Sequence, residues 1–159
     1  IVTGASAVAD PAVADTYRGT VGAFQQALAA RLKVAERPEV IVFIHGFNSD
    51  LDDSLATAAS LWHFSGRFGV PITYSWPAGN RGLTAYIKDR ESGEFSIYHL
   101  KEFLRALAAT PGLKKIHIVA HSRGADVTTT ALRELAIFEM GAGRDPARSL
   151  KVATLILAA

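Results

Sequence analysis

The sequence predicts a three-layer α/β/α fold with a mostly parallel, doubly wound sheet. Four short runs rich in branched apolar residues are continuous rather than alternating, which is typical of parallel strands buried on both faces: Val40–Ile44, Ile72–Trp76, Ile116–Ala120 and Val152–Leu157. Helical patterns lie between these runs, so strand and helix alternate along the chain. The 159 residues, 49% of them hydrophobic, are enough for one core. We therefore expect a single domain over 1–159 with its core in 38–159.

The helices are predicted from apolar residues at helical spacing. A first helix precedes the first strand, a second opens with a capping box at Ser49 and Asp52, a third ends at Pro111-Gly112, and a fourth ends near Gly141. The stretch from Pro77 to Gly93 is expected to hold a loop or a broken helix. The apolar stripes are Val21, Phe24, Leu28 and Leu32; Leu51, Leu55, Ala58 and Trp62; Leu100, Phe103, Leu104 and Leu107; and Val127, Ala131, Leu135 and Phe138.

Composition excludes several classes of protein and site. Seventeen basic and fifteen acidic residues are interleaved, with no basic stripe of the kind that indicates nucleic-acid binding. The absence of cysteine excludes disulfides, a thiolate nucleophile and a Cys-based zinc site. No run approaches the roughly 20 apolar residues that span a bilayer. The chain opens at Ile1 without a secretion signal, so we expect a missing natural N-terminus and a cytoplasmic location. Neither a metal nor a cofactor is expected.

A nucleophile elbow is predicted where the third strand meets the following helix. Residues 118–125 read IVAHSRGA and match G-x-S-x-G with Ala120 in place of the first glycine. Turning from strand to helix at one residue strains the backbone of Ser122 and requires small neighbours such as Gly124. The turn exposes the hydroxyl and directs the Arg123 N–H toward a developing oxyanion. A serine in an ordinary strand-to-helix turn is the alternative, and the strand–turn–helix context favours the elbow.

The end of the first strand, IHGFN at 44–48, predicts the second half of an oxyanion hole. Gly46 allows a close backbone approach, Phe47 offers the second N–H, and His45 orients the loop. A loop glycine beside a satisfied histidine is the alternative. If the strand order is second–first–third–fourth, both motifs meet at the topological switch point, where open α/β sheets bind ligands.

These segments resemble those of a known family. VIVFIHGFN, ITYSWPAGN, IHIVAHSRGADV and the stretch with Tyr86, Asp89, Arg90 and Glu91 are similar to the bacterial esterase/lipase-like α/β-hydrolases catalogued as domain of unknown function nine hundred. The resemblance covers roughly 40–159. It implies an α/β-hydrolase fold, Ser122 as nucleophile and the 45–48 loop beside it. Arg123 stands where family members often carry an apolar residue, and we expect its side chain to point to solvent rather than to bind an anionic substrate.

The base and acid of a serine triad are missing from the predicted positions. In this fold their order is Ser, acid, His, yet no histidine follows Ser122, and Asp126, Glu134 and Asp145 precede the last strand. We expect both groups beyond Ala159, a fold lacking its C-terminal part, an exposed final strand and little turnover by these 159 residues.

The remaining titratable residues are expected to be structural. His121 is expected to pack because adjacent side chains at an elbow diverge, and His117 to make core or neighbouring contacts. Tyr86 and Asp89 are expected to support the loop around Trp76-Pro77.

The leading hypothesis is thus a serine hydrolase acting on a small-molecule ester or acyl substrate. A non-catalytic scaffold that binds a partner or small ligand, and acyl transfer to an acceptor other than water, are the alternatives.

Overall fold

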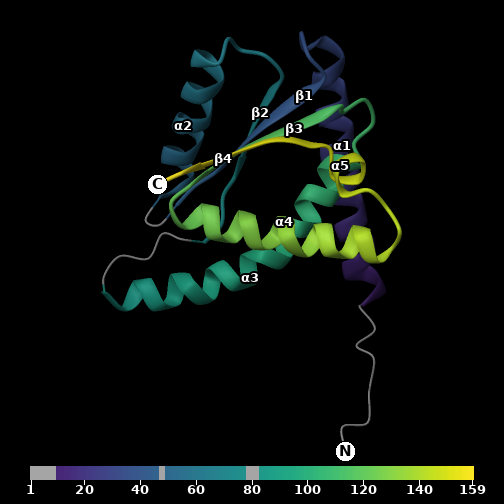
Figure 1. Ribbon diagram of the computed structural model, residues 1–159. Coiled ribbons are helices and arrows are strands. Elements are labelled where there is room, and N and C mark those ends of the chain that lie inside the picture. Colours follow the sequence, from purple (N-terminus) through teal and green to yellow (C-terminus); the bar gives the residue numbers. More distant parts are fainter. Residues whose placement is uncertain (1–9, 47–48, 78–82) are drawn as a thin grey trace, which may run out of the picture.

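Helices cover both faces of a four-stranded parallel sheet (Figure 1). The computed structural model describes residues 10–46, 49–77 and 83–159, with side chains described outside 83–94. In chain order the elements are α1 (Pro11–Val34), β1 (Glu39–Ile44), α2 (Leu51–Phe64), β2 (Val70–Tyr74), α3 (Leu83–Ala108), β3 (Lys115–His121), α4 (Arg123–Gly141), α5 (Pro146–Leu150) and β4 (Val152–Ala158). The strand order β2-β1-β3-β4 confirms the predicted one, and every neighbouring pair is parallel.

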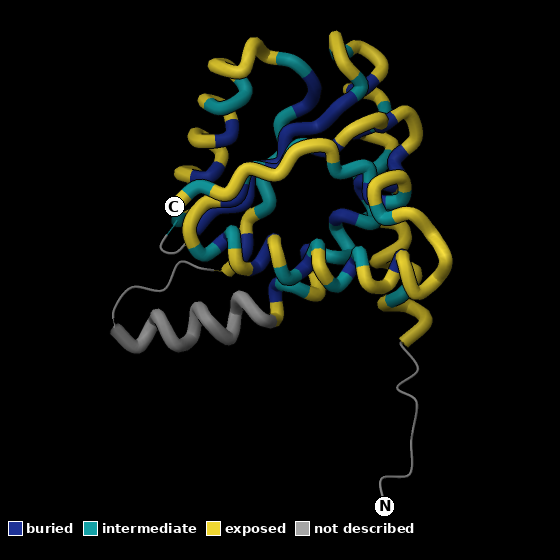
Figure 2. The backbone as a smooth tube through the Cα atoms, in the orientation of Figure 1, coloured by how far each residue is buried: buried dark blue, intermediate teal, exposed yellow. Residues whose placement is uncertain are grey.

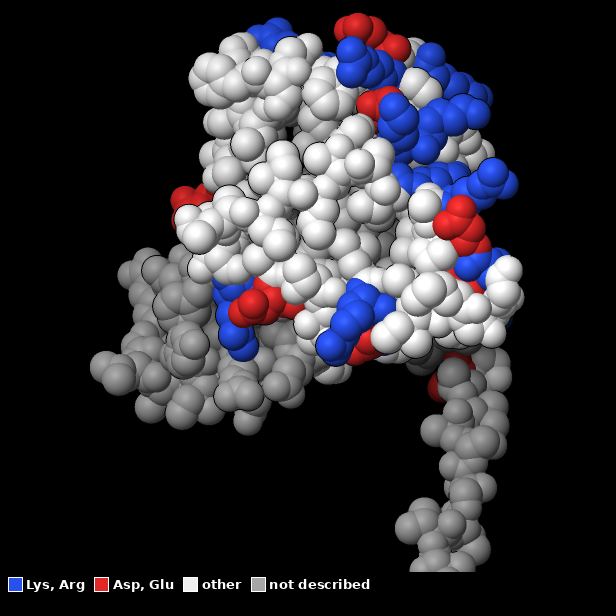
Figure 3. Space-filling view, in the orientation of Figure 1, with Lys and Arg blue, Asp and Glu red and all other residues white. Residues whose placement is uncertain are grey.

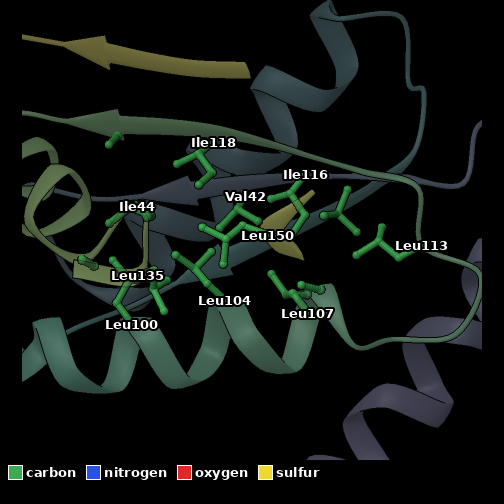
Figure 4. Packing of buried hydrophobic residues seen from close by; sticks show 14 of the residues in the cluster. Val42, Ile44, Leu100, Leu104, Leu107, Leu113, Ile116, Ile118, Leu135 and Leu150 are labelled. Atoms are coloured by element: carbon green, nitrogen blue, oxygen red, sulfur yellow. The ribbon is translucent and has the colours of Figure 1, made fainter. Parts of the chain in front are cut away.

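One face of the sheet, which we call the closed face, packs against α1, α3 and α4. It presents Val42, Ile44 and Ile118, all of them fully buried. Figure 4 shows side chains of α3, among them Leu100 and Leu104, pointing toward these strands. Each such side chain contributes about 1.5–3 kcal/mol by leaving water. The closed face therefore holds the main core.

The other face, which we call the open face, is covered by α2 alone among the described helices. It carries Phe43, His117, Val119 and His121, which alternate along their strands with closed-face residues. Ala58 is buried where α2 packs on β1 and β2. α2 packs mainly on β1 and β2, away from β4 at the edge of the sheet (Figure 1).

β4 lies at the edge of the sheet, as predicted for the final strand. Its side chains Leu155, Ile156 and Leu157 are 39%, 51% and 51% exposed, and the strand is exposed along most of its length in Figure 2. β3 is more buried than β4, with Ile116, Ile118 and Ala120 fully buried, because strands flank it on both sides.

The structure differs from the predicted helices at three points. α3 begins at Leu83 and runs through Gly93, where a loop or broken helix was expected. The many good helix formers of this segment outweigh the roughly 1 kcal/mol disadvantage of glycine. The cap of α2 is Asp50, which accepts the Asp53 N–H at 2.9 Å, rather than Ser49. The short helix α5 was missed, although Asp145 as cap followed by Pro146 is a typical helix start.

Charge is distributed unevenly over the visible face (Figure 3). Uncharged residues cover the region of α2 and β4, whereas Lys and Arg gather on the side of α5 and the amino ends of the strands. Lys114, Lys115, Arg148 and Lys151 line one hollow there. Charges that are interleaved along the sequence are thus brought together by the fold.

Candidate active site

Ser122 occupies a strained turn between β3 and α4. Its backbone has φ 51° and ψ −122°, a conformation that costs a non-glycine residue about 1–3 kcal/mol. The residue is exposed at the carboxyl end of β3. The structure therefore has the backbone strain and the exposure that the G-x-S-x-G pattern predicts.

Two glycines bring the end of β1 against this turn. A Cβ on Gly46 would lie 2.9 Å from the Cβ of Ser122 and 3.1 Å from Nδ1 of His121. A Cβ on Gly124 would lie only 2.4 Å from the carbonyl oxygen of His45. The Gly46 position would also lie 2.9 Å from the His121 carbonyl oxygen, and since real Cβ atoms do not approach backbone so closely, both positions require glycine. β1 and β3 are paired neighbours, so the two sequence motifs meet as expected.

Backbone hydrogen bonds around Ser122 leave a donor at the start of α4. The Ser122 N–H donates to the Ala158 carbonyl of β4 at 2.7 Å, and the Ala125 N–H donates to the Ser122 carbonyl at 2.9 Å. As the first residue of α4, Arg123 has an N–H with no intrahelical acceptor. Phe47, the other expected donor, lies outside the described residues.

His45 holds the β1 loop in place and has no nitrogen left to act as a base. The side chain is fully buried. The Trp76 backbone N–H donates to Nε2 of His45 at 3.1 Å. This places the ring proton of His45 on Nδ1, which donates to the Gly46 carbonyl at 2.9 Å. The imidazole ring of His45 and the indole ring of Trp76 are stacked, and the Trp76 indole N–H donates to the His45 carbonyl at 2.8 Å. Sequence reasoning expected His45 to orient the loop but missed Trp76, which follows the end of the neighbouring strand.

The Arg123 side chain was expected to point to solvent, but it is held against α4. Its guanidinium donates to Asp126, one turn along α4, at 3.1 Å, and the side chain is 26% exposed. An Asp three residues ahead on the same helix is close enough to bind it. This pairing also accounts for Asp126, one of the four acids that follow Ser122.

The other acids after Ser122 also have structural partners. Glu134 pairs with Lys101 at 2.5 Å, and Asp145 caps α5. Glu139, which sequence reasoning did not single out, is buried at the end of α4 and forms two hydrogen bonds with Arg144, at 2.6 and 3.0 Å. These hydrogen bonds lower the pKa of Glu139 to about 2.

The histidines of β3 lie on the open face. His117 Nε2 lies 3.0 Å from Glu39 and its Nδ1 lies 3.0 Å from the Thr154 hydroxyl, which confirms contacts with neighbouring residues. Burial raises the pKa of Glu39, but His117 and Lys115 outweigh it and the net shift is downward. His121 is exposed, so the expectation that it packs was wrong: the residue lies at the last position of β3, where the side chains of the open face are incompletely covered.

No base contacts Ser122 among the side chains that the structure describes. Among the side chains of 10–46, 49–77 and 95–159, none hydrogen-bonds to the Ser122 hydroxyl, and those side chains include no cluster of metal-binding groups. The side chains of Tyr86 and Asp89 lie outside the described residues. None of the described helices carries an apolar stretch long enough to cross a bilayer.

Comparison with known proteins identifies the family. Residues 20–159 match the family described as alpha/beta hydrolase of unknown function (DUF900), and the chain belongs to it. The match begins within α1, twenty residues before the segments that carried the resemblance. α1 also contributes Leu28 and Leu32 to the core, so the core extends upstream of 38. Neither a curated protein nor a solved structure matches the chain.

Proposed function

We propose that this member of the α/β-hydrolase family is a serine hydrolase of esterase or lipase type, with Ser122 as its nucleophile. The observation that carries the proposal is the strained conformation of Ser122, at φ 51° and ψ −122°, pressed against Gly46. Strain of this kind persists only where the surrounding structure enforces it, and it concentrates at active sites.

The proposed reaction uses the hydroxyl of Ser122 and backbone donors. The oxygen attacks an ester carbonyl carbon while a general base takes its proton. The N–H groups of Arg123 and Phe47 stabilise the oxyanion, and removing one such donor typically costs about 2.7–4 kcal/mol of transition-state stabilisation. The carbon–oxygen bond then breaks, the alcohol leaves with the proton, and water releases the acid from the serine by the same steps.

The proposed base and its acid lie outside residues 1–159. No histidine follows Ser122 in the sequence, and the described ring nitrogens of His45 and His117 are engaged elsewhere. His45 and Gly46 position the loop, and Gly124 lets α4 start against β1.

Covalent labelling tests the nucleophile. The full-length protein of the natural reading frame is treated with a fluorophosphonate probe, whose phosphorus is attacked as fluoride leaves, and the modified residue is mapped by mass spectrometry. We expect label on Ser122, loss of label in Ser122→Ala and unchanged labelling in Ser60→Ala, an exposed serine of α2. Label on another residue, or none, would reject the nucleophile.

Turnover by the 159-residue chain tests the missing base. We expect little or no hydrolysis of a short activated ester. Hydrolysis that disappears in Ser122→Ala would show that the base lies within these residues.

A non-catalytic scaffold is the second candidate function. The absence of a base beside Ser122 among the described side chains favours it. A full-length protein that folds but fails to react with the probe would support the scaffold over the enzyme.

A further inference from the structure

A hollow on the open face lies beside the proposed nucleophile. It has a volume of about 360 Å³ and lies between α2 and the carboxyl ends of the strands. Phe43, Val119 and Ala158 line it from β1, β3 and β4, and Leu61 lines it from α2. In Figure 1 these strand ends, the start of α4 and the start of α2 lie at the same side of the molecule. The volume is at the lower end of the range for small-molecule sites.

The rim of the hollow adjoins the elbow. His121, the residue before Ser122, lines the hollow, and so does Ala158, whose carbonyl accepts the Ser122 N–H at 2.7 Å. His121 Nδ1 and the Cβ of Ser122 both border Gly46, at 3.1 and 2.9 Å from the position of its missing Cβ. A group attached to the Ser122 oxygen therefore starts at the edge of the hollow.

The two hydroxyls that α2 places at the hollow are engaged within the helix itself. The Ser54 hydroxyl donates to the Asp50 carbonyl at 2.7 Å, and the Thr57 hydroxyl donates to the Asp53 carbonyl at 2.9 Å. With their protons used by the helix itself, these side chains offer mainly methyl and methylene surface. Among the described lining residues, the one carboxylate is Asp53, which disfavours an anionic ligand.

We propose that this hollow binds the apolar chain of an uncharged, medium-chain ester whose carbonyl lies at Ser122. Its volume of about 360 Å³ lies at the lower end of the range for small-molecule sites, which favours a medium-length chain over a long lipid chain. The position of the ester carbonyl rests on the proposed role of Ser122 as nucleophile. The choice of an apolar chain rests on the lining of the hollow alone.

Binding of simple alcohols to the 159-residue chain tests the hollow without requiring catalysis. Butanol, hexanol and octanol are titrated and amide shifts are followed by NMR. We expect affinity to rise up to about fourfold per methylene, with shifts at Val119 and Leu61, and octanoate to bind more weakly than octanol. Affinity that does not depend on chain length, or shifts elsewhere, would overturn the assignment.

Two neighbouring positions on α2 supply matched variants. Thr57→Phe places a ring in the hollow, whereas Ala56→Phe adds the same ring at an exposed position that does not line it. We expect at least tenfold weaker octanol binding in Thr57→Phe and no change in Ala56→Phe, with folding checked by circular dichroism. Val119→Phe fills the hollow from β3 and replaces Thr57→Phe if that variant does not fold. Unchanged binding in a folded, filled variant would contradict the proposal.

Labelling kinetics separate the two proposals. Alkyl fluorophosphonates from ethyl to octyl are compared on the full-length protein. We expect Ser122 to be labelled faster with increasing chain length, and this dependence to disappear in Thr57→Phe. Labelling without chain-length dependence would overturn the hollow as chain site while leaving Ser122 as nucleophile. Octanol binding with no labelling of Ser122 would overturn the nucleophile while leaving an apolar site.

Discussion

The two faces of the sheet differ in how far they bury the side chains of the same strands. On the closed face, Val42, Ile44 and Ile118 are fully buried against helices. On the open face, Val119 lines a hollow of about 360 Å³ and His121 is exposed. Dense packing leaves no room for a ligand, whereas an incompletely covered face does. The difference suggests that stability resides mainly on the closed face and ligand binding on the open one.

The elbow stands where these two faces end. Gly124 packs on the closed side against the carbonyl groups of Ile44 and His45, while His121 lines the hollow on the other side. The backbone of Ser122 is therefore held in place by packing on the closed face, while the open face leaves room for a ligand beside it.

Adjacent truncations on β3 give the largest expected effect and test the comparison directly. Ile118→Ala removes buried carbon from the closed face and should lower the free energy of unfolding by about 2–5 kcal/mol. Val119→Ala on the open face should lower it by about 1 kcal/mol. Urea denaturation monitored by circular dichroism measures both. Equal losses would show that the two faces contribute alike.

Two glycines of α4 provide a smaller effect with an internal control. Gly124→Ala places a methyl group 2.4 Å from the His45 carbonyl oxygen, and we expect a loss of about 1–3 kcal/mol from the displaced backbone. Gly141→Ala meets nothing within 4 Å and should be neutral or slightly stabilising because alanine favours helix. The same urea titration measures both variants. A neutral Gly124→Ala would mean that β1 and α4 are less tightly apposed than their geometry indicates.

Relief of strain at the elbow should produce a gain in stability. Ser122→Gly removes the penalty of a positive φ, so we expect the free energy of unfolding to rise by about 1 kcal/mol. Ser122→Ala keeps a Cβ and should leave stability nearly unchanged while removing the hydroxyl. Thermal denaturation of the two variants compares them. A Ser122→Gly variant no more stable than Ser122→Ala would argue against strain at this residue.

The smallest effect is expected at the far end of α4, from a single ion pair. Arg144 lowers the pKa of Glu139 from 4.5 to about 2. The folded protein therefore binds a proton here less readily than the unfolded chain, so the pair stabilises the fold above about pH 5 and this contribution is lost as the pH falls toward 2. Urea midpoints between pH 6 and 2.5 should fall less steeply in Glu139→Gln than in the unsubstituted protein.

A second variant tests that mechanism. Arg144→Gln removes the cation and should give the same shallower pH dependence as Glu139→Gln. A profile in Arg144→Gln as steep as that of the unsubstituted protein would assign the pH dependence to other carboxylates.

Local patterns predicted most of the fold correctly. Continuous apolar runs identified all four strands because a strand buried on both faces tolerates few polar residues. β2 alone was displaced, beginning two residues earlier at Val70 and ending at Tyr74, since Trp76 is buried by its contact with His45 rather than by strand pairing. The helix over 83–94 was missed because a charged segment with a glycine shows no apolar stripe.

The candidate site was predicted only in outline. The spacing of Ser122 and Gly124 indicated the turn, and Gly46 indicated a close approach, because such turns admit only small residues. The pairing of His45 with Trp76 and the hollow under α2 left no comparable signal, since each joins residues far apart in sequence.

The amino-acid sequence by itself determined the alternation of strands and helices and the position of the strained serine, because these follow from short-range patterns of size and polarity. Only the tertiary structure decided which face of the sheet is filled and which is left hollow. That outcome depends on how helices distant in sequence pack across the sheet, and a strand with apolar residues on both sides carries no record of which side will be covered.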